Sequence, residues 1–301
     1  MDPCKEQKKM PCIRLGEADP ATTLTRPPAP FPTHSTAEQR AEMRFGVHGN
    51  AVFTGGAGVL ALASARALLE HGLEGIALLD LSRAFEQSEA NIRALRADFP
   101  GGKILTYPCD VTDAKEMSGV AERIRDQLGA PPKILCCFAG IVGCVAAEEM
   151  EIEQWRRLID VNTTGSWIAA QTFGKQMIAA AQGGRIVLVA SISGHRVNFP
   201  QPQVAYNVSK AAVLHMRSSL AAEWTRYGIR VNSISPGYMD TPLNEGEDLE
   251  AWRQVWAERN PMRRMGSPQE LTGPVVFLCS DIGGSYVNGA DIVVDGGGLV
   301  F

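Results

Sequence analysis

A tyrosine and a lysine four residues apart are the side chains in this chain best suited to proton transfer. They are Tyr206 and Lys210, in the run Tyr-Asn-Val-Ser-Lys, and Ser191 precedes the tyrosine by fifteen residues. Residues four apart on a helix share one face, so an ammonium group beside a phenol would favour phenolate and lower its pKa. A nearby serine hydroxyl could polarise a carbonyl. The pattern predicts acid/base chemistry at a carbonyl or alcohol oxygen, although the same spacing also occurs on exposed helix faces.

A glycine-rich segment, Thr-Gly-Gly-Ala-Gly-Val-Leu-Ala, begins at residue 54 directly after an apolar run. Glycines let the backbone turn tightly and bring a pyrophosphate against the free N–H groups at a helix start. The candidate cofactor contacts are Gly55, Gly58 and Leu60. A glycine cluster alone also suits an ordinary turn, and its position after the first expected strand favours nucleotide binding.

Acidic residues follow the next two apolar runs. Asp80, with Leu81 beside it, lies about 20 residues beyond the glycines, where a carboxylate can bind a ribose diol and repel a 2′-phosphate. The alternative is a helix cap or turn residue. Asp110, followed by Val111, could accept the adenine amino group, and a plain turn aspartate fits this position nearly as well.

Seven short apolar runs alternate with segments of helical periodicity from residue 46 onward. The expected strands are 47–53, 76–80, 103–107, 133–138, 184–190, 229–235 and 292–295, and the expected helices are 57–71, 85–98, 113–128, 152–181 and 206–227. Strands that are apolar throughout are buried on both faces, and helical crossovers force parallel pairing. The sequence therefore predicts a doubly wound α/β sheet with helices on both faces. Ligands bind such sheets at the carboxyl ends of the strands. Ala139 and Gly140, after the fourth run, are small enough to let a cofactor ring pass close to the backbone.

The first 45 residues differ in composition from the rest, because they hold 7 of the 18 prolines and only one of the 30 glycines. Proline favours extended backbone and lacks an N–H donor. We therefore expect residues 1–45 to form a proline-rich tail with a short helix near 37–44, and residues 46–301 to form a single domain.

Composition excludes several classes of function. The net charge of -4 and the lack of a basic run argue against a nucleic-acid partner. No apolar stretch approaches the roughly 20 residues of a membrane-spanning helix, and no apolar leader supports secretion, so a cytoplasmic protein is expected. The seven cysteines lack Cys-x-x-Cys spacing and predict buried free thiols in a reducing compartment, with no metal site.

Several further motifs occur in a fixed order. They are Asn162 in Asp-Val-Asn, Gly194 three residues after Ser191, Pro236-Gly237, Thr241, and Asp295-Gly296-Gly297. With the Tyr-x-x-x-Lys pair, these make residues 47–298 resemble a short-chain dehydrogenase/reductase with a Rossmann-type fold. The resemblance implies an NAD(P)-dependent oxidoreductase that transfers a hydride between nicotinamide and a secondary alcohol or ketone.

The resemblance also implies roles for individual residues. Tyr206 would be the proton donor or acceptor, and Lys210 would lower its pKa and hold the nicotinamide ribose. Ser191 would orient the substrate carbonyl, and Asn162 would support a water relay. Gly194 matches the family position when counted from Ser191, which favours Ser191 over Ser193.

Other residues would contact the cofactor. These are Pro236, Gly237, Met239 and Thr241, the last of them at the carboxamide or a phosphate. Asp80 makes NAD the expected cofactor and NADP the second choice, since Arg83 could partly offset the repulsion of a 2′-phosphate. A homo-oligomer, dimer or tetramer, is implied by the resemblance alone.

A narrower resemblance concerns the substrate. The runs starting at Pro200 and Ser235 are similar to those of fungal polyol enzymes such as arabinitol 2-dehydrogenase and sorbose or mannitol reductases. Related reductases also tailor fungal secondary metabolites, so a polyol and a secondary-metabolite ketone both remain possible small-molecule substrates. The expected lid, residues 244–265, contains Trp252, Trp256, Met262 and Met265, which could line a broad apolar pocket or simply pack on the core.

Three positions depart from the family pattern. Val59 and Ala61 replace two glycines of the cofactor loop, and Phe138 replaces the usual asparagine before Ala139-Gly140. A branched side chain at position 59 would project where the backbone approaches the cofactor. These departures support one alternative, a non-redox member of the fold that serves as a ligand-binding scaffold or a cyclisation catalyst.

Overall fold

Seven parallel strands form one sheet in the order β3-β2-β1-β4-β5-β6-β7. The computed structural model describes residues 11–16, 24–242 and 249–300. The strands are β1 (Asn50–Thr54), β2 (Gly75–Asp80), β3 (Lys103–Pro108), β4 (Ile134–Cys137), β5 (Gly184–Val189), β6 (Ile229–Pro236) and β7 (Asp291–Val294). Successive strands are added toward one edge from β1 to β3 and toward the other edge from β4 to β7, so the order changes sides between β1 and β4. The doubly wound fold predicted from the sequence is confirmed.

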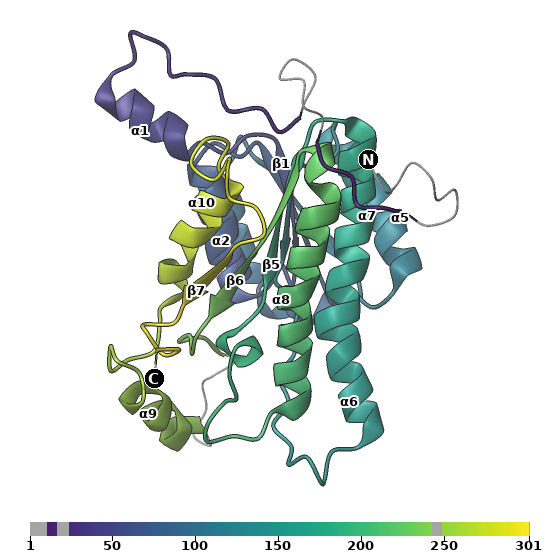
Figure 1. The fold of residues 1–301 in the computed structure, drawn as a ribbon, viewed down its shortest axis with the longest axis vertical. Helices are drawn as coiled ribbons and strands as arrows, with labels where there is room; N and C mark the ends of the chain where they lie inside the picture. Colours follow the sequence, from purple (N-terminus) through teal and green to yellow (C-terminus); the bar gives the residue numbers. More distant parts are fainter. Residues whose placement is uncertain (1–10, 17–23, 243–248, 301) are drawn as a thin grey trace, which may run out of the picture.

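Helices cover both faces of this sheet (Figure 1). Helices α2 (Val59–Glu70), α4 (Glu89–Asp98) and α10 (Thr272–Cys279) pack into one apolar core. Helices α5 (Ala114–Leu128), α7 (Gly165–Ala180) and α8 (Val204–Trp224) pack into the other. The central strands are buried on both faces because their side chains alternate between these two cores, as their nearly continuous apolar runs require.

Two expected helices are interrupted. The segment 85–98 is two helices, α3 (Ser82–Gln87) and α4, which meet at Ser88. The Ser88 hydroxyl donates a 2.7 Å hydrogen bond to the carbonyl of Ala57, and serine readily leaves helical geometry for such bonds. The segment 152–181 comprises α6 (Ile152–Ile159), a π-helical turn (Asp160–Thr164) and α7. Turns of this kind often occur at functional sites.

The amino-terminal segment is described in two parts. Helix α1 (Ala37–Phe45) has a capping box at Thr36, which confirms the short helix expected near 37–44. Leu24 packs on Gly228 at the amino ends of β5 and β6, since a Cβ on that glycine would lie 2.7 Å from the Leu24 Cβ. The remaining helix, α9 (Glu250–Glu258), lies near the carboxyl ends of the strands and follows residues 243–248, which are outside the described residues.

The cysteines only partly match expectation. Cys109, Cys136, Cys137 and Cys279 are buried free thiols, whereas Cys144 is an exposed free thiol. Cys12 is disulfide-bonded, which corrects the prediction of free thiols for that residue. It lies in the proline-rich segment, where no apolar core is available to bury a thiol. Within the described residues, no helix is long and apolar enough to cross a membrane.

Candidate active site

A cavity of about 630 Å³ opens at the carboxyl ends of β4, β5 and β6. Nine of the predicted site residues line it: Leu60, Gly140, Ser191, Tyr206, Lys210, Pro236, Gly237, Met239 and Thr241. They come from segments far apart in the sequence, and the sheet brings them together because its parallel strands all end at one edge. The cavity volume is in the range of small-molecule sites.

The hydroxyl groups of Ser191 and Tyr206 meet in this cavity. Ser191 begins the short turn Ile192–Gly194 after β5, and its side chain caps that turn by accepting from the Ser193 N–H at 3.1 Å. Its hydroxyl donates to the Ser193 hydroxyl at 3.0 Å. Burial raises the pKa of Tyr206, which lies in the first turn of α8, and the Ser191 side chain partly opposes this rise. Lys210 is not among the causes of this shift, so its expected effect on the pKa of Tyr206 stays a prediction.

Lys210 is buried one helical turn beyond Tyr206. Its Nζ donates a 2.9 Å hydrogen bond to the carbonyl of Val189, at the end of β5, and lies 5.7 Å from the centre of the Tyr206 ring. Burial lowers the pKa of Lys210 to about 8. The carbonyl uses one of the three ammonium hydrogens, and the group also lines the cavity, so it can still donate to a ligand there.

Asn162 is fully buried in the π-helical turn, and its side-chain amide connects two segments of the site. The amide nitrogen donates to the carbonyl of Ile141 at 3.0 Å and to the Ser209 hydroxyl at 2.9 Å, while its oxygen accepts from the Ile141 N–H at 2.8 Å. Asn162 therefore fixes the loop after β4 against α8. A Cβ on Gly140 would lie 3.3 Å from the Asn162 amide oxygen and 3.4 Å from the Lys210 Nζ, so only a glycine leaves this space open.

The glycine segment forms a tight turn against the loop after β4. Gly55 has a φ of 64°, and a Cβ there would lie 2.6 Å from the Ala139 nitrogen, so position 55 requires glycine. Gly58 is the N-cap of α2, and no side chain caps this helix. Its first-turn N–H groups are thus available to an anion. Leu60 lines the cavity, whereas Val59 is half-buried and is not part of the lining.

Asp80 ends β2 beside the glycine turn. Its carboxylate accepts hydrogen bonds from the Ala57 N–H at 3.1 Å and the Leu81 N–H at 2.8 Å. Burial raises the pKa of Asp80, and the two N–H donors act against that rise. Asp80 therefore holds the turn in place, and Leu81 is exposed at the start of α3.

The residues singled out after β3 and β4 differ in how far they are buried and in what they contact. Asp110 is exposed, and its carboxylate accepts from the N–H and hydroxyl of Thr112, as in a plain turn. Val111 is buried against Gly165. Phe138 stacks on Phe53 with ring centres 6.0 Å apart, so apolar packing replaces the usual polar side chain at this position.

Gln201, Gln203 and Tyr238 line the cavity but were not singled out from the sequence, and two of them contact the predicted lid residue Trp256. The rings of Tyr238 and Trp256 stack with centres 4.4 Å apart, and Gln201 connects them by donating to the Tyr238 hydroxyl and accepting from the Trp256 indole. Burial raises the pKa of Tyr238 to about 12. Gln203 donates to the Cys144 sulfur at 3.2 Å. These residues lie in the sequence runs that start at Pro200 and Ser235, which support the narrower family resemblance. The polar side chains in these runs were the signal that could have indicated a polar part of the site.

Only part of the expected lid lines the cavity. Trp252 and Trp256, on α9, line the cavity. Met262 is 62% exposed, and neither it nor Met265 is part of the lining, so the pocket-lining alternative does not apply to these two methionines. Residues 244–248 of the expected lid lie outside the described residues.

Comparison with known proteins identifies the family. Residues 56–298 match a family model described as enoyl-(acyl carrier protein) reductase, adh_short_C2. A solved short-chain dehydrogenase/reductase from Mycobacterium marinum superimposes with a TM-score of 0.79 at 36% identity, covering 86% of this chain and 98% of that one. The chain belongs to the short-chain dehydrogenase/reductase family.

Two curated members of this family are similar over most of their length. D-arabinitol 2-dehydrogenase (ribulose-forming) of Candida tropicalis is 35% identical over 258 residues, which is 82% of this chain and 90% of the relative. NADH-dependent L-xylulose reductase of Ambrosiozyma monospora is 36% identical, covering 82% and 93%. This short-chain dehydrogenase/reductase is accordingly an NAD(P)-dependent oxidoreductase acting on CH–OH groups. The non-redox alternative receives no support from these relatives.

The buried Lys210 should make the stability of the protein depend on pH. Its pKa is about 8 in the folded protein and 10.5 in the unfolded chain, so between these values the unfolded state binds more protons. The free energy of unfolding should therefore rise from pH 8 to pH 10.5. Lys210→Met should lack this rise and should be more stable at pH 7 by up to ~3 kcal/mol.

Urea unfolding at pH 7 and at several alkaline pH values measures this effect. Lys175→Met, on the exposed face of α7, is the matched control and should keep the parent's pH dependence. If the free energy of unfolding of Lys210→Met still rose between pH 8 and pH 10.5, the pH dependence could not be assigned to the buried Lys210.

Proposed function

We propose that this enzyme interconverts a polyol and the corresponding ketose, with Tyr206 as the acid/base group. The observation that carries the proposal is that Ser191, Tyr206 and Lys210 line the same cavity. A substrate oxygen within reach of both hydroxyls would sit where the proton must be exchanged. The relatives named above act on sugar alcohols and ketoses, which supports this substrate class.

The residues at the strand ends fit a dinucleotide cofactor. The uncapped start of α2 offers N–H groups to a pyrophosphate, and Gly140 leaves open the space beside Asn162 and Lys210. A nicotinamide cofactor, when bound, supplies or accepts the hydride. We assign its contacts to the predicted set, namely Gly55, Gly58, Leu60, Asp80, Leu81, Asp110, Val111, Ala139, Gly140, Tyr206, Lys210, Pro236, Gly237, Met239 and Thr241.

The chain's own groups would handle the proton. In ketone reduction, the Tyr206 hydroxyl donates its proton to the substrate oxygen, and in alcohol oxidation the phenolate accepts it. Ser191 donates a hydrogen bond to the same oxygen and so polarises the carbonyl. Lys210 places a positive charge beside the phenolate once it forms. Asn162 acts as a positioning residue that holds the loop after β4 against α8.

The polar part of the cavity supports a polyhydroxylated substrate. Asn198 lines the cavity, and its side-chain oxygen is buried without a hydrogen-bond partner among the described residues. A buried carbonyl oxygen of this kind costs free energy until a donor reaches it, and a polyol hydroxyl is such a donor. The Tyr238 hydroxyl accepts from Gln201 and therefore keeps its own hydrogen to donate. The Trp252 and Trp256 rings complete the wall and fit the carbon face of a sugar chain.

Replacing the acid/base group gives the sharpest test of this mechanism. Tyr206→Phe should lower kcat by about 100- to 10,000-fold while nucleotide affinity stays within a few-fold, because only the transferable proton is lost. Tyr227→Phe, in the short 3-10 turn that follows α8, should keep full activity. Because burial raises the pKa of Tyr206, ketone reduction should be active at neutral pH, whereas alcohol oxidation should increase as pH rises. Steady-state kinetics measure both effects, and an active Tyr206→Phe enzyme would overturn the proposal.

We further propose that NAD(H) is preferred over NADP(H). The Asp80 carboxylate can accept hydrogen bonds from a ribose diol and would repel a 2′-phosphate. The ratio of kcat/KM for NADH to that for NADPH should exceed one, and Asp80→Ser should lower it. Arg83 is exposed three residues further along and is the control position. If the wild-type ratio were below one and rose in Arg83→Gln, then Arg83 rather than Asp80 would determine the cofactor preference.

Two proposals concern the setting of the enzyme. Family resemblance supports a homo-oligomer, a dimer or tetramer paired through the helices at 152–181 and 206–227. The four buried free thiols support a reducing compartment, and we place the enzyme in the cytoplasm on that ground. The disulfide at Cys12 is not explained by this location.

A further inference from the structure

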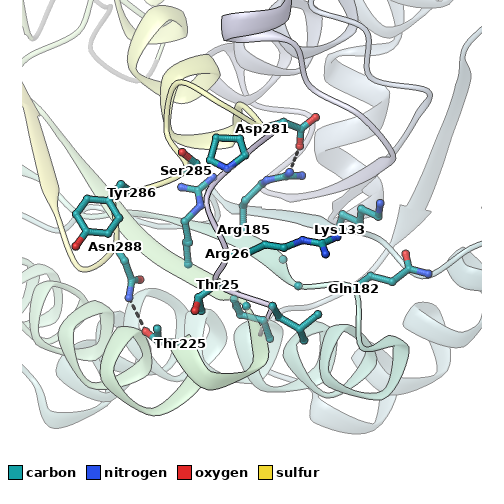
Figure 2. Close-up of a pocket in the computed structure, with 17 residues that line it drawn as sticks. Thr25, Arg26, Lys133, Gln182, Arg185, Thr225, Asp281, Ser285, Tyr286 and Asn288 are labelled. Carbon is teal, nitrogen blue, oxygen red and sulfur yellow. Dashed lines mark hydrogen bonds and ion pairs between the residues drawn. The ribbon is translucent and has the colours of Figure 1, made fainter. Parts of the chain in front are cut away.

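A second cavity, of about 520 Å³, lies at the opposite end of the sheet from the catalytic cavity. Figure 2 shows its walls, which come from segments far apart in the sequence. The amino-terminal segment around Arg26 forms one side, the starts of β5 and β6 form the floor, and the loop from Asp281 to Asn288 forms the rest. Among the described residues, the two cavities share no lining residue.

Positive charge predominates in this second cavity. Its described lining includes four cationic side chains, those of Arg26, Lys133, Arg185 and Arg230, and a single carboxylate, that of Asp281. Asp281 is already paired, because it accepts from Arg185 and contacts His48. Arg26 and Lys133 form no salt bridge with any described residue. The cavity therefore carries an excess of positive charge.

Arg185 is oriented but incompletely bonded. One end of its guanidinium, Nη2, binds Asp281, which fixes the side chain within the cavity (Figure 2). The other end, Nη1, is buried without a hydrogen-bond partner among the described residues. An unpaired guanidinium hydrogen in a buried position is costly, and an anionic oxygen is the partner that best removes this cost.

Arg230 adds a fixed charge to the floor of the cavity. Its guanidinium donates to the carbonyls of Leu278, Ser280 and Val287, so its position is set by the backbone. Burial lowers the pKa of Arg230 to about 10, and the neighbouring Arg185 lowers it further in the same direction. Two guanidinium groups that destabilise each other's charge would both be stabilised by an anion between them.

We propose that this second cavity binds the phosphate group of a small organic phosphate. Arg185 Nη1, Arg26 and Lys133 are the direct ligands, and Arg230 contributes charge from the floor. A phosphate dianion matches the excess charge, and its oxygens match the planar fork of arginine. The volume exceeds that of a phosphate ion, and Leu24, Pro28 and Tyr286 offer an apolar wall to the organic part of the ligand.

Calorimetric titration of the full chain with inorganic phosphate and with phenyl phosphate tests this site. Wild-type protein should bind, and Arg26→Gln and Lys133→Gln should each weaken binding about tenfold. Both residues lie outside the two apolar cores, so the variants should fold normally. Arg93→Gln, which removes the same charge from the exposed face of α4, is the matched control and should bind as wild type does.

The two probes distinguish the sources of the phosphate group. Tighter binding of phenyl phosphate supports an organic phosphate, and equal binding of both supports free phosphate as the ligand. Absence of binding by either probe would overturn the proposal. Binding that is unchanged in Arg26→Gln and Lys133→Gln, or that falls equally in Arg93→Gln, would also overturn it, because the phosphate would then bind elsewhere or without specificity. Neither outcome bears on the catalytic cavity, so this test is independent of the proposed reaction.

Discussion

The buried amide of Asn162 connects the two parts of the catalytic cavity that come from distant segments. Its oxygen and nitrogen bind both backbone groups of Ile141, and the nitrogen also binds the Ser209 hydroxyl on α8. Ser209 in turn donates to the carbonyl of Tyr206. The loop after β4, the π-helical turn and the first turns of α8 are thereby held in one arrangement. The positions of Tyr206 and Lys210 depend on this arrangement, and so does the open space at Gly140.

Burial of a titratable group in the site lowers the stability of the folded protein. Burial of Lys210 lowers its pKa to about 8, so keeping it protonated near neutral pH opposes folding. Burial of Tyr206 raises its pKa, which favours the protonated form needed to reduce a ketone. A bound cofactor and substrate would change both environments, since each side chain borders the cavity. Among the described residues, the Ser191 side chain lowers the pKa of Tyr206 and so favours the phenolate.

The sequence was sufficient to predict the seven strands, the helical segments between the first six of them and the residues that follow each strand, but it did not predict α10. This succeeded because apolar runs and glycine turns are local signals, and because parallel strands bring their carboxyl ends to one edge. The break at Ser88 was missed, since it depends on a hydrogen bond to Ala57, 31 residues earlier. The Gln201, Tyr238 and Trp256 cluster was missed for the same reason, as its members meet only in the folded chain.

The direction of the pKa shift at Tyr206 also could not be predicted from the sequence. Spacing placed Lys210 on the same helix face, and the lysine Nζ does lie 5.7 Å from the ring centre. Burial is the largest cause of the shift in the Tyr206 pKa, and burial is a property of the whole fold. Val59 lies at the start of α2 and outside the cavity lining, so its expected obstruction of the cofactor stays a prediction.

Transfer of a labelled hydride is the most direct test of the central claim, that this cavity moves hydride between a secondary alcohol and a nicotinamide. Purified enzyme would be incubated with oxidised cofactor and arabinitol deuterated at its secondary carbons, and the reduced cofactor would be examined by mass spectrometry. The account predicts one deuterium on the nicotinamide ring of the product, and none with Tyr206→Phe. Ketose formation that leaves no deuterium on the nicotinamide, or no transfer with any polyol or ketose, would contradict it.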